Sequence, residues 1–265
     1  MLSNDEKPDR LHSRLEDTRM ASRLKLIGTI ATFILMFAGA AFAQRAALDK
    51  YLFQGMLELA SQGDHEAEYH VGMLLNNGIG TAPDRKQAFR WFEKSANAGH
   101  PLGAYKLGCY YAGQFPDVVE VDSELALKYK LVAAQQGYDL AETDVARHYY
   151  ASKNYQQAIR WWTEAAAQGE PGAMYRLSAE YAQGQIVEPD LAKSYHYLNA
   201  LKNMPEFSSD PTLANAFATL TKMMSSAEIA AAKNAAAFVE VPTPLTLKAR
   251  AGVSQAEEYL AANMK

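Results

Sequence analysis

The feature that most constrains the fold of this chain is a pattern that returns at a nearly constant distance. An aromatic pair, a run of small residues and a closing glycine occur in RWFEKSANAGH at 90–100 and again in RWWTEAAAQGE at 160–170. Aligned on the closing glycines, the units end at Gly63, Gly99, Gly137 and Gly169, with spacings of 36, 38 and 32 residues. Periods of this length are typical of arrays in which each unit buries its apolar face against the next unit.

The residues after each closing glycine predict an amphipathic helix. In each unit a small residue is followed by an aliphatic residue at i+4, a small residue at i+5 and a large residue at i+8, and these positions share one face of a helix. The i+5 position is Gly72, Gly108, Ala146 and Ser178, and the i+8 position is Leu75, Tyr111, Tyr149 and Tyr181.

A second helix is predicted in each unit from its cap and from a pairing of small with large residues. The expected N-caps are Asp84, Asp122, Asn154 and Asp190, with Gln87 and Gln157 placed for capping-box-like turns. Each cap is followed by a small residue and then by an aromatic residue expected in the core, namely Trp91, Tyr129, Trp161 and Tyr197. We expect Trp91→Ala or Trp161→Ala to open a cavity that costs about 3–5 kcal/mol.

The ends of these second helices are marked by residues that stop a helix. Gly99, Gly137 and Gly169 suit a left-handed C-terminal residue, whereas Pro205 takes that place in the fourth unit. Beyond it, Asp210 and Pro211 predict a helix to about Met224, and a capping box at 225–228 predicts another to about Val239. The segment 241–265 predicts an extended stretch with two prolines and then a short helix capped by Ser254 with Glu257. The sequence leaves open whether this tail docks on the array.

The amino-terminal residues predict export. Residues 26–43 read LIGTIATFILMFAGAAFA without a charge, after Arg23 and Lys25, and end in an A-x-A motif. This is the layout of a signal peptide cleaved before Gln44, and an uncleaved signal anchor is the alternative. Translation from Met20 instead of Met1 would give a more compact signal peptide.

Composition limits the kinds of partner. The net charge is −4, and the acidic excess grows beyond the basic amino terminus, which argues against nucleic-acid binding. Cys109 is the only cysteine, so no intrachain disulfide can form, and we expect its thiol to be buried.

Candidate catalytic and metal motifs are weak. HEAEYH at 65–70 lacks the second histidine of HExxH, and its two histidines are five residues apart, which separates them around a helix. Because His70 aligns with the polar residues Lys106, Asp144 and Arg176, we expect it to be exposed. No GxSxG or phosphate-binding Gly-Lys loop is present, so neither an enzyme nor any cofactor or metal is predicted.

The unit at 67–99, AEYHVGMLLNNGIGTAPDRKQAFRWFEKSANAG, carries a small-x3-Val-Gly element, a Gly-x-Gly loop, Asp-x2-Lys/Gln-Ala and aromatic-x4-Ala-x2-Gly. These elements resemble the Sel-1-like repeat, a relative of the tetratricopeptide repeat. The resemblance covers roughly 47–205, with a lone second helix at 47–63, and it implies an all-α, right-handed α-solenoid of stacked helix pairs. The third unit lacks the glycine loop and the second has a longer loop at 113–122, so regular curvature is not expected there.

We therefore divide the chain into an export segment (1–43), a repeat solenoid (44–205), a helical carboxy-terminal cap (206–240) and a tail (241–265). In related solenoids the first helices line the concave surface, where tyrosine favours protein contacts. The predicted partner-binding residues on that surface are Tyr69, His70, Tyr105, Lys106, Tyr110, Asp144, His148, Tyr175 and Arg176.

The function predicted from these observations is that of a periplasmic adaptor or regulator that binds envelope proteins, for example in signalling or polysaccharide export. It would contact the membrane only through an uncleaved amino terminus. Two alternatives stay open: an envelope enzyme acting on cell-wall or β-lactam-type substrates, and a secreted host-interaction factor.

Overall fold

The computed structural model describes residues 41–235 and 240–264, and every regular element in these ranges is a helix. A helix over 41–61 precedes the repeats. The repeat helices are α2 (His65–Asn77), α3 (Arg85–Asn97), α4 (Pro101–Cys109), η2 (Tyr110–Gln114), α5 (Ser123–Ala134), α6 (Asp139–Ala151), α7 (Tyr155–Ala167), α8 (Pro171–Gln183) and α9 (Leu191–Asn203). They are followed by η3 (Pro205–Phe207), α10 (Pro211–Met223), α11 (Ser226–Asn234), α12 (Pro244–Ala251) and α13 (Val253–Asn263).

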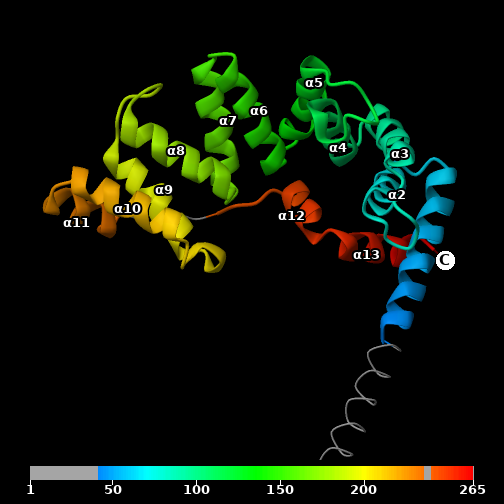
Figure 1. Cartoon of the computed structure of the whole chain (residues 1–265). Coiled ribbons are helices and arrows are strands. Elements are labelled where there is room, and N and C mark those ends of the chain that lie inside the picture. The colour runs from blue at the N-terminus through cyan, green and yellow to red at the C-terminus, as the bar shows by residue number, and fades with distance from the viewer. Residues whose placement is uncertain (1–40, 236–239, 265) are drawn as a thin grey trace, which may run out of the picture.

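The repeat helices pack as the pairs α2/α3, α4/α5, α6/α7 and α8/α9, and successive pairs touch through α3/α4, α5/α6 and α7/α8. Figure 1 shows that the pairs form an arc, with α10 and α11 at the end beyond α9. The prediction of stacked helix pairs is thus confirmed.

Local signals place the helix ends where the sequence predicts them. The predicted cap side chains accept backbone N–H groups of the first turn, with Asp122 Oδ1 at 2.9 Å from Leu125 N and Asp190 Oδ1 at 2.9 Å from Lys193 N. Asp84 and Asn154 cap α3 and α7 in the same way. Gly63, Gly99, Gly137 and Gly169 all have positive φ, between 80° and 89°, as expected of residues that end a helix.

Small and large residues interlock between the two helices of a unit. The rings of Tyr111 and Tyr129 stack at 5.9 Å, and those of Tyr181 and Tyr197 at 6.3 Å. A Cβ on Gly72 would lie 2.6 Å from the Phe92 ring, and one on Gly108 would lie 2.8 Å from Lys130 Cγ. Glycine at these two positions therefore lets the second helix approach.

The prediction that the aromatic residues of the second helices lie in the core needs correction at three of four positions, since Trp91, Tyr129 and Tyr197 are only partly buried. Phe92 is fully buried, whereas Trp91 is only partly buried and its ring lies under the Lys94 ammonium at 4.2 Å. In the third unit both Trp161 and Trp162 are buried, at 9% and 2% exposure. The core position of the first unit therefore belongs to Phe92.

The two irregular units differ as the sequence predicts. In the second unit η2 extends α4 as a π-helix, and Gly113 with φ 93° leads into the longer loop. In the third unit α6 and α7 are joined by three residues, and Lys153 adopts a left-handed φ of 62° in place of a glycine.

The helices beyond the fourth unit confirm some predictions and correct others. Asp210 caps α10, and the capping box of Ser225 with Glu228 is present at the start of α11. α11 ends at Asn234, before the predicted Val239, and residues 236–239 lie outside the described ranges. Residues 240–243 are outside any helix, and Thr243 has an extended backbone, but α12 begins already at Pro244, so the predicted extended run is shorter than expected. The predicted short helix is present as α13, whereas no side chain caps it, so the Ser254 cap was a wrong prediction.

The predicted export segment lies almost entirely outside the described residues, which begin at position 41. In the part of the chain that is described, no helix combines the length and the apolar character needed to cross a bilayer.

Candidate protein-interaction site

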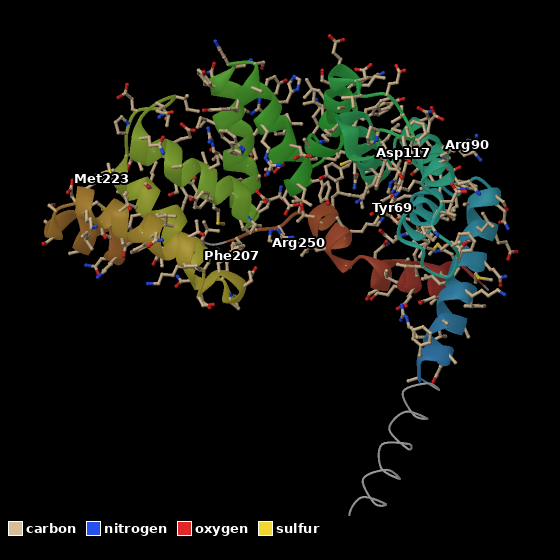
Figure 2. All side chains as sticks on the ribbon, viewed as in Figure 1. Tyr69, Arg90, Asp117, Phe207, Met223 and Arg250 are labelled. Carbon is tan, nitrogen blue, oxygen red and sulfur yellow. The ribbon has the colours of Figure 1, made fainter. Side chains whose placement is uncertain are left out.

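The tail docks on the inner side of the arc. In Figure 1, α12 and α13 run back beneath the repeats from the end of the arc towards α2 and the helix over 41–61. We call the surface that they cover the inner groove, and we define it by Glu66, Gly137, Asp139 and Gln168. Figure 2 labels Arg250, which belongs to the tail, on this side of the arc.

A threonine turn of the tail binds where two repeats end. Thr243 Oγ1 donates to the Gly137 carbonyl at 2.6 Å, and its N–H donates to Gln168 Oε1 at 3.1 Å. Thr246 is fully buried; its hydroxyl lies 2.7 Å from Gln168 Oε1 and accepts the Asp139 N–H at 3.1 Å. A Cβ on Gly137 would lie 2.7 Å from Thr243 Cγ2, so glycine is needed here for docking as well as for φ.

Gln168 is held in place from the opposite side. Its Nε2 donates to Glu142 Oε2 at 2.9 Å, and both side chains are buried. Burial, together with the charges of Glu164 and Asp139, raises the pKa of Glu142 to about 7, against the effect of the Gln168 hydrogen bond. The carboxyl group therefore orients the amide that receives the tail.

Two cationic side chains of the tail meet two acidic groups of the groove. Arg250 Nη2 lies 2.6 Å from Asp139 Oδ2 and also donates to the Gln168 carbonyl at 3.2 Å. The Asp139 side chain is 3% exposed. Lys248 Nζ contacts Glu66 Oε2, whose side chain is 11% exposed.

Glu66 lies at the centre of a cluster of basic groups. His100 Nε2 lies 3.0 Å from Oε2, and His70 Nε2 lies 3.1 Å from Oε1. Burial alone would raise the pKa of Glu66, but the contacts with His100, His70 and Lys248 outweigh it and hold the pKa well below its usual value. The carboxylate is thus ionised while largely removed from water.

α13 attaches the tail to the start of the array. Tyr259 Oη donates to Asp64 Oδ2 at 2.7 Å, and Leu260 is buried. A Cβ on Gly55 would lie 2.7 Å from Leu260 Cδ1, so α13 packs closely on the helix over 41–61.

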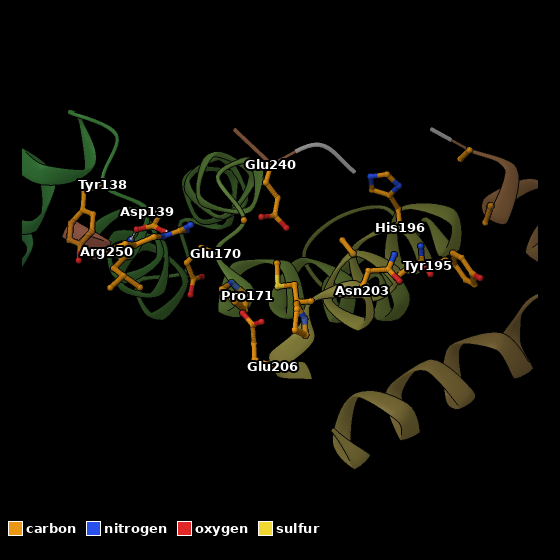
Figure 3. Close-up of a pocket in the computed structure, with 18 of the residues that line it drawn as sticks. Tyr138, Asp139, Glu170, Pro171, Tyr195, His196, Asn203, Glu206, Glu240 and Arg250 are labelled. Atoms are coloured by element: carbon orange, nitrogen blue, oxygen red, sulfur yellow. Dashed lines mark hydrogen bonds and ion pairs between the residues drawn. The ribbon is translucent and has the colours of Figure 1, made fainter. Parts of the chain in front are cut away.

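A pocket of about 760 Å³ adjoins the groove at the Asp139–Arg250 pair. Figure 3 shows Glu170, Glu206 and Glu240 around it, with Tyr195 and His196. Glu170 is occupied as the N-cap of α8, because it accepts Ala173 N–H at 2.6 Å and the Thr143 hydroxyl at 2.8 Å. The lining thus combines four acidic side chains, those of Asp139, Glu170, Glu206 and Glu240, with the cationic side chains of Lys233 and Arg250.

The profile of the Sel1 repeat matches residues 65–100, 101–138, 143–170 and 171–200, which together make up about half of the chain. The chain belongs to the Sel1 repeat family. Sel1 repeat proteins are generally adaptors or scaffolds.

Relatives of this Sel1 repeat protein occur in viruses and bacteria. A sel1-like repeat-containing protein of Acanthamoeba polyphaga mimivirus is 31% identical over 134 residues, covering 50% of this chain and 24% of that protein. An uncharacterized protein of Neisseria meningitidis serogroup B is 32% identical over 150 residues, covering 56% of this chain and 32% of that protein. The chain thus spans between a quarter and a third of the length of these curated relatives.

The crystal structure of a Sel1 repeat protein from Oxalobacter formigenes has the same fold. It superimposes with a TM-score of 0.54 at 21% identity, over 66% of this chain and 78% of that one.

The predicted partner-binding residues of the first two Sel1 repeats mostly lie against the tail or inside the array. Tyr69 is buried, and its ring stacks on that of His100 at 5.2 Å. His70 is 3% exposed, so the prediction that it is exposed was wrong: it lies beside Glu66 and beneath the tail. Tyr105 packs edge-on against Tyr138 at 4.8 Å, and burial raises its pKa.

Two of the predicted residues do not belong to the inner side. Tyr110 is 1% exposed, and its hydroxyl donates to Asn76 Oδ1 at 2.9 Å, while burial raises its pKa to about 12. His148 lines a crevice with Leu131 and other residues of α5, and no tail residue lines this crevice. In the alignment of the repeats, Tyr110 and His148 fell among the residues that were predicted to lie on the partner-binding surface.

The remaining candidates are at least partly accessible. Tyr175 is 44% exposed, and Lys106 is partly buried. Asp144 pairs with Lys130 at 2.6 Å and with Arg147 at 2.9 Å. The Arg176 guanidinium lies 4.2 Å from the centre of the Tyr150 ring and 2.5 Å from Glu180, so it supports the packing of α8 on the third unit.

Sequence reasoning missed Glu66, Asp139 and Gln168. A signal for them was available, since all three lie within three residues of a closing glycine, at the junction between units. Asp64, His100 and Glu170 follow these glycines directly and cap the next helix.

Reactive and metal-binding groups are sparse in the described part of the chain. No group of three or more His, Cys, Asp or Glu side chains in these ranges is arranged to hold a metal ion. Cys109 is half-buried, and burial raises the pKa of its thiol, which disfavours the reactive thiolate.

Proposed function

We propose that this Sel1 repeat protein is a protein-interaction adaptor or regulator of the bacterial cell envelope that works in the periplasm. The observation that carries the proposal is the inner groove, where side chains and backbone carbonyls from successive repeats converge on one bound polypeptide segment. Surfaces that present such groups in fixed positions suit the recognition of protein segments.

The envelope location is proposed from the sequence of residues 26–43, an uncharged apolar stretch that follows basic residues and ends in Ala-Phe-Ala. The acidic balance of the chain supports a protein partner over a nucleic acid.

Affinity purification from gently solubilised cell envelopes tests this function. Lys106 and Tyr175 are the positions to change, because both retain accessible surface on first helices. We expect a near-stoichiometric companion with the unaltered chain, and its loss with Lys106→Ala combined with Tyr175→Ala in a chain that keeps its helical circular dichroism.

Lys86→Ala is the control, since Lys86 is exposed at the start of the second helix of its unit. If no companion is recovered with the unaltered chain, from cross-linked as well as native envelopes, the adaptor function is wrong. Export is tested separately by fractionation, and a protein found only in the cytoplasm contradicts the proposed location.

A further inference from the structure

We propose that the inner groove is a binding site for a partner peptide that presents a threonine turn followed by two cationic side chains, and that the tail occupies this site in cis. The inference rests on the adaptor function proposed above and names the chemistry of the partner. A partner would bind by displacing the chain's own residues 241–263.

The tail binds the groove through hydrogen bonds to groups at the ends of repeats. Thr243 and Thr246 donate to the Gly137 carbonyl and to the side-chain carbonyl of Gln168, two groups that lie where repeats end. The tail backbone adds a hydrogen bond from Val241 N to the Ala167 carbonyl at 2.9 Å. A segment from another protein can make the same bonds, since none depends on covalent continuity with this chain.

Charge pairing also selects what the groove binds. Asp139 and Glu66 belong to different repeats, and each receives one cation of the tail, Arg250 and Lys248 respectively. Buried carboxylates are costly without counter-charges, so an occupant without cations at these positions is disfavoured. The spacing Lys-x-Arg is thus the main determinant of which peptides fit.

The tail buries few of its own side chains. Within α12 the buried side chain is that of Thr246, and Leu247 is 55% exposed. Within α13, Ala256 and Leu260 are buried. Such a segment buries little apolar surface compared with the repeat helices, and it belongs to the least stable part of a structure, which opens most readily.

A bound cis segment lowers the apparent affinity for any competitor, because the peptide binds only the fraction of molecules whose groove is open. The probe is therefore a fluorescein-labelled synthetic peptide of residues 240–264, measured by fluorescence anisotropy with the full chain. We expect weak binding by the unaltered chain and at least tenfold tighter binding by the chain with Lys248→Ala and Arg250→Ala.

Adding Glu66→Gln and Asp139→Asn to that double variant should reduce the affinity at least tenfold again. The same loss is expected when the labelled peptide itself carries Lys248→Ala and Arg250→Ala. The control chain carries Lys86→Ala and Lys222→Ala, two exposed lysines outside the groove, and should bind the peptide as the unaltered chain does.

Hydrogen exchange of residues 241–263 measures whether the tail has left the groove, which is needed to interpret each binding result. If the double variant releases its tail yet fails to bind the peptide, the groove is not a peptide site. If its tail stays as protected as in the unaltered chain, the two cations are not anchors, and the proposal is also overturned.

Sedimentation of the unaltered chain tests whether a second copy of the chain occupies the groove. If the unaltered chain is a dimer and the Lys248→Ala and Arg250→Ala substitutions abolish the dimer, the occupant is a second copy. That result would overturn the proposal of a separate partner. If the groove fails the peptide test but the chain still captures an envelope companion, the adaptor function stands and only this inference is overturned.

Discussion

At the scale of single residues, burial distinguishes neighbours that look equivalent in the sequence. Trp91 and Phe92 are adjacent aromatics on α3, but the Phe92 ring fills the space above Gly72 while Trp91 lies partly in water beside Lys94. The aligned aromatic residues of the repeats therefore identify one face of the helix, whereas packing decides how deeply each aromatic side chain is buried.

Phe92→Ala should lower the free energy of unfolding by about 3–5 kcal/mol, because it leaves a cavity between α2 and α3. Trp91→Ala should cost clearly less, since its ring is partly solvated and much of its area stays exposed. Urea denaturation of both variants measures the difference. Equal losses would mean that Trp91 is the core residue after all.

Glu142 is a buried carboxyl group with a pKa of about 7, above its value in an unfolded chain. A raised folded-state pKa means that the folded protein binds the proton more tightly, so stability is highest below the unfolded pKa and falls as the pH rises towards 7. Glu142→Gln keeps an acceptor for Gln168 without a charge. We expect this variant to be more stable than the unaltered chain at pH 8 and to lose less stability between pH 5 and 8.

Thermal unfolding at several pH values checks this prediction. Glu66 does not affect the pH profile between pH 5 and 8, because its pKa is lowered and its contribution to stability is lost only in more acidic solution. A pH profile unchanged by Glu142→Gln would show that the carboxyl group titrates normally.

At the scale of elements, the second helix of each repeat begins at a capping side chain that the sequence reveals. Asp122 accepts the N–H groups of Glu124 and Leu125 at 3.0 and 2.9 Å, and these donors have no partner within α5. Similar caps at the other second helices set the register of every unit.

Asp122→Ala should therefore cost about 1 kcal/mol of stability. The loss should be accompanied by faster hydrogen exchange in the first turn of α5, because both N–H groups lose their acceptor. Ser123→Ala is the matched control, since Ser123 is exposed and gives no cap. A loss of the same size in both variants would contradict the role of the Asp122 cap.

At the scale of the whole molecule, the tail ties the two halves of the array together. It contacts the junctions at Gly137 and Gln168, the cluster at Glu66 and the helix over 41–61, which are far apart in the sequence. Thr246 is the buried centre of these contacts.

Thr246→Val keeps the shape of the side chain but removes the acceptor of the Asp139 N–H and the hydroxyl that donates to Gln168 Oε1. The cost should be about 1–3 kcal/mol. Hydrogen exchange should accelerate over 241–263 while α8 and α9 keep their protection. Thr163→Val, at an exposed hydroxyl of α7, should change neither region. Retained protection of the tail in the Thr246 variant would contradict this account.

The sequence by itself determined the repeat, its helix caps and its glycine stops, because these depend on residues close together in the chain. Asp190 caps α9 through a group three residues away, and Gly169 takes a positive φ for reasons of local backbone geometry. Even the irregular second and third units were predicted, since an insertion or deletion is visible in the spacing.

Which segment covers the inner side could not be predicted from the sequence and is known from the folded chain alone. The tail meets Asp139 and Glu66 across 111 and 182 residues of sequence, and no periodic pattern relates such positions. The same limit explains the candidate residues: the repeat register placed Tyr110 and His70 in surface columns, whereas packing buried both. Local preferences fix how each helix begins and ends, but burial and charge pairing depend on which distant segments meet, and that is settled only when the whole chain is folded.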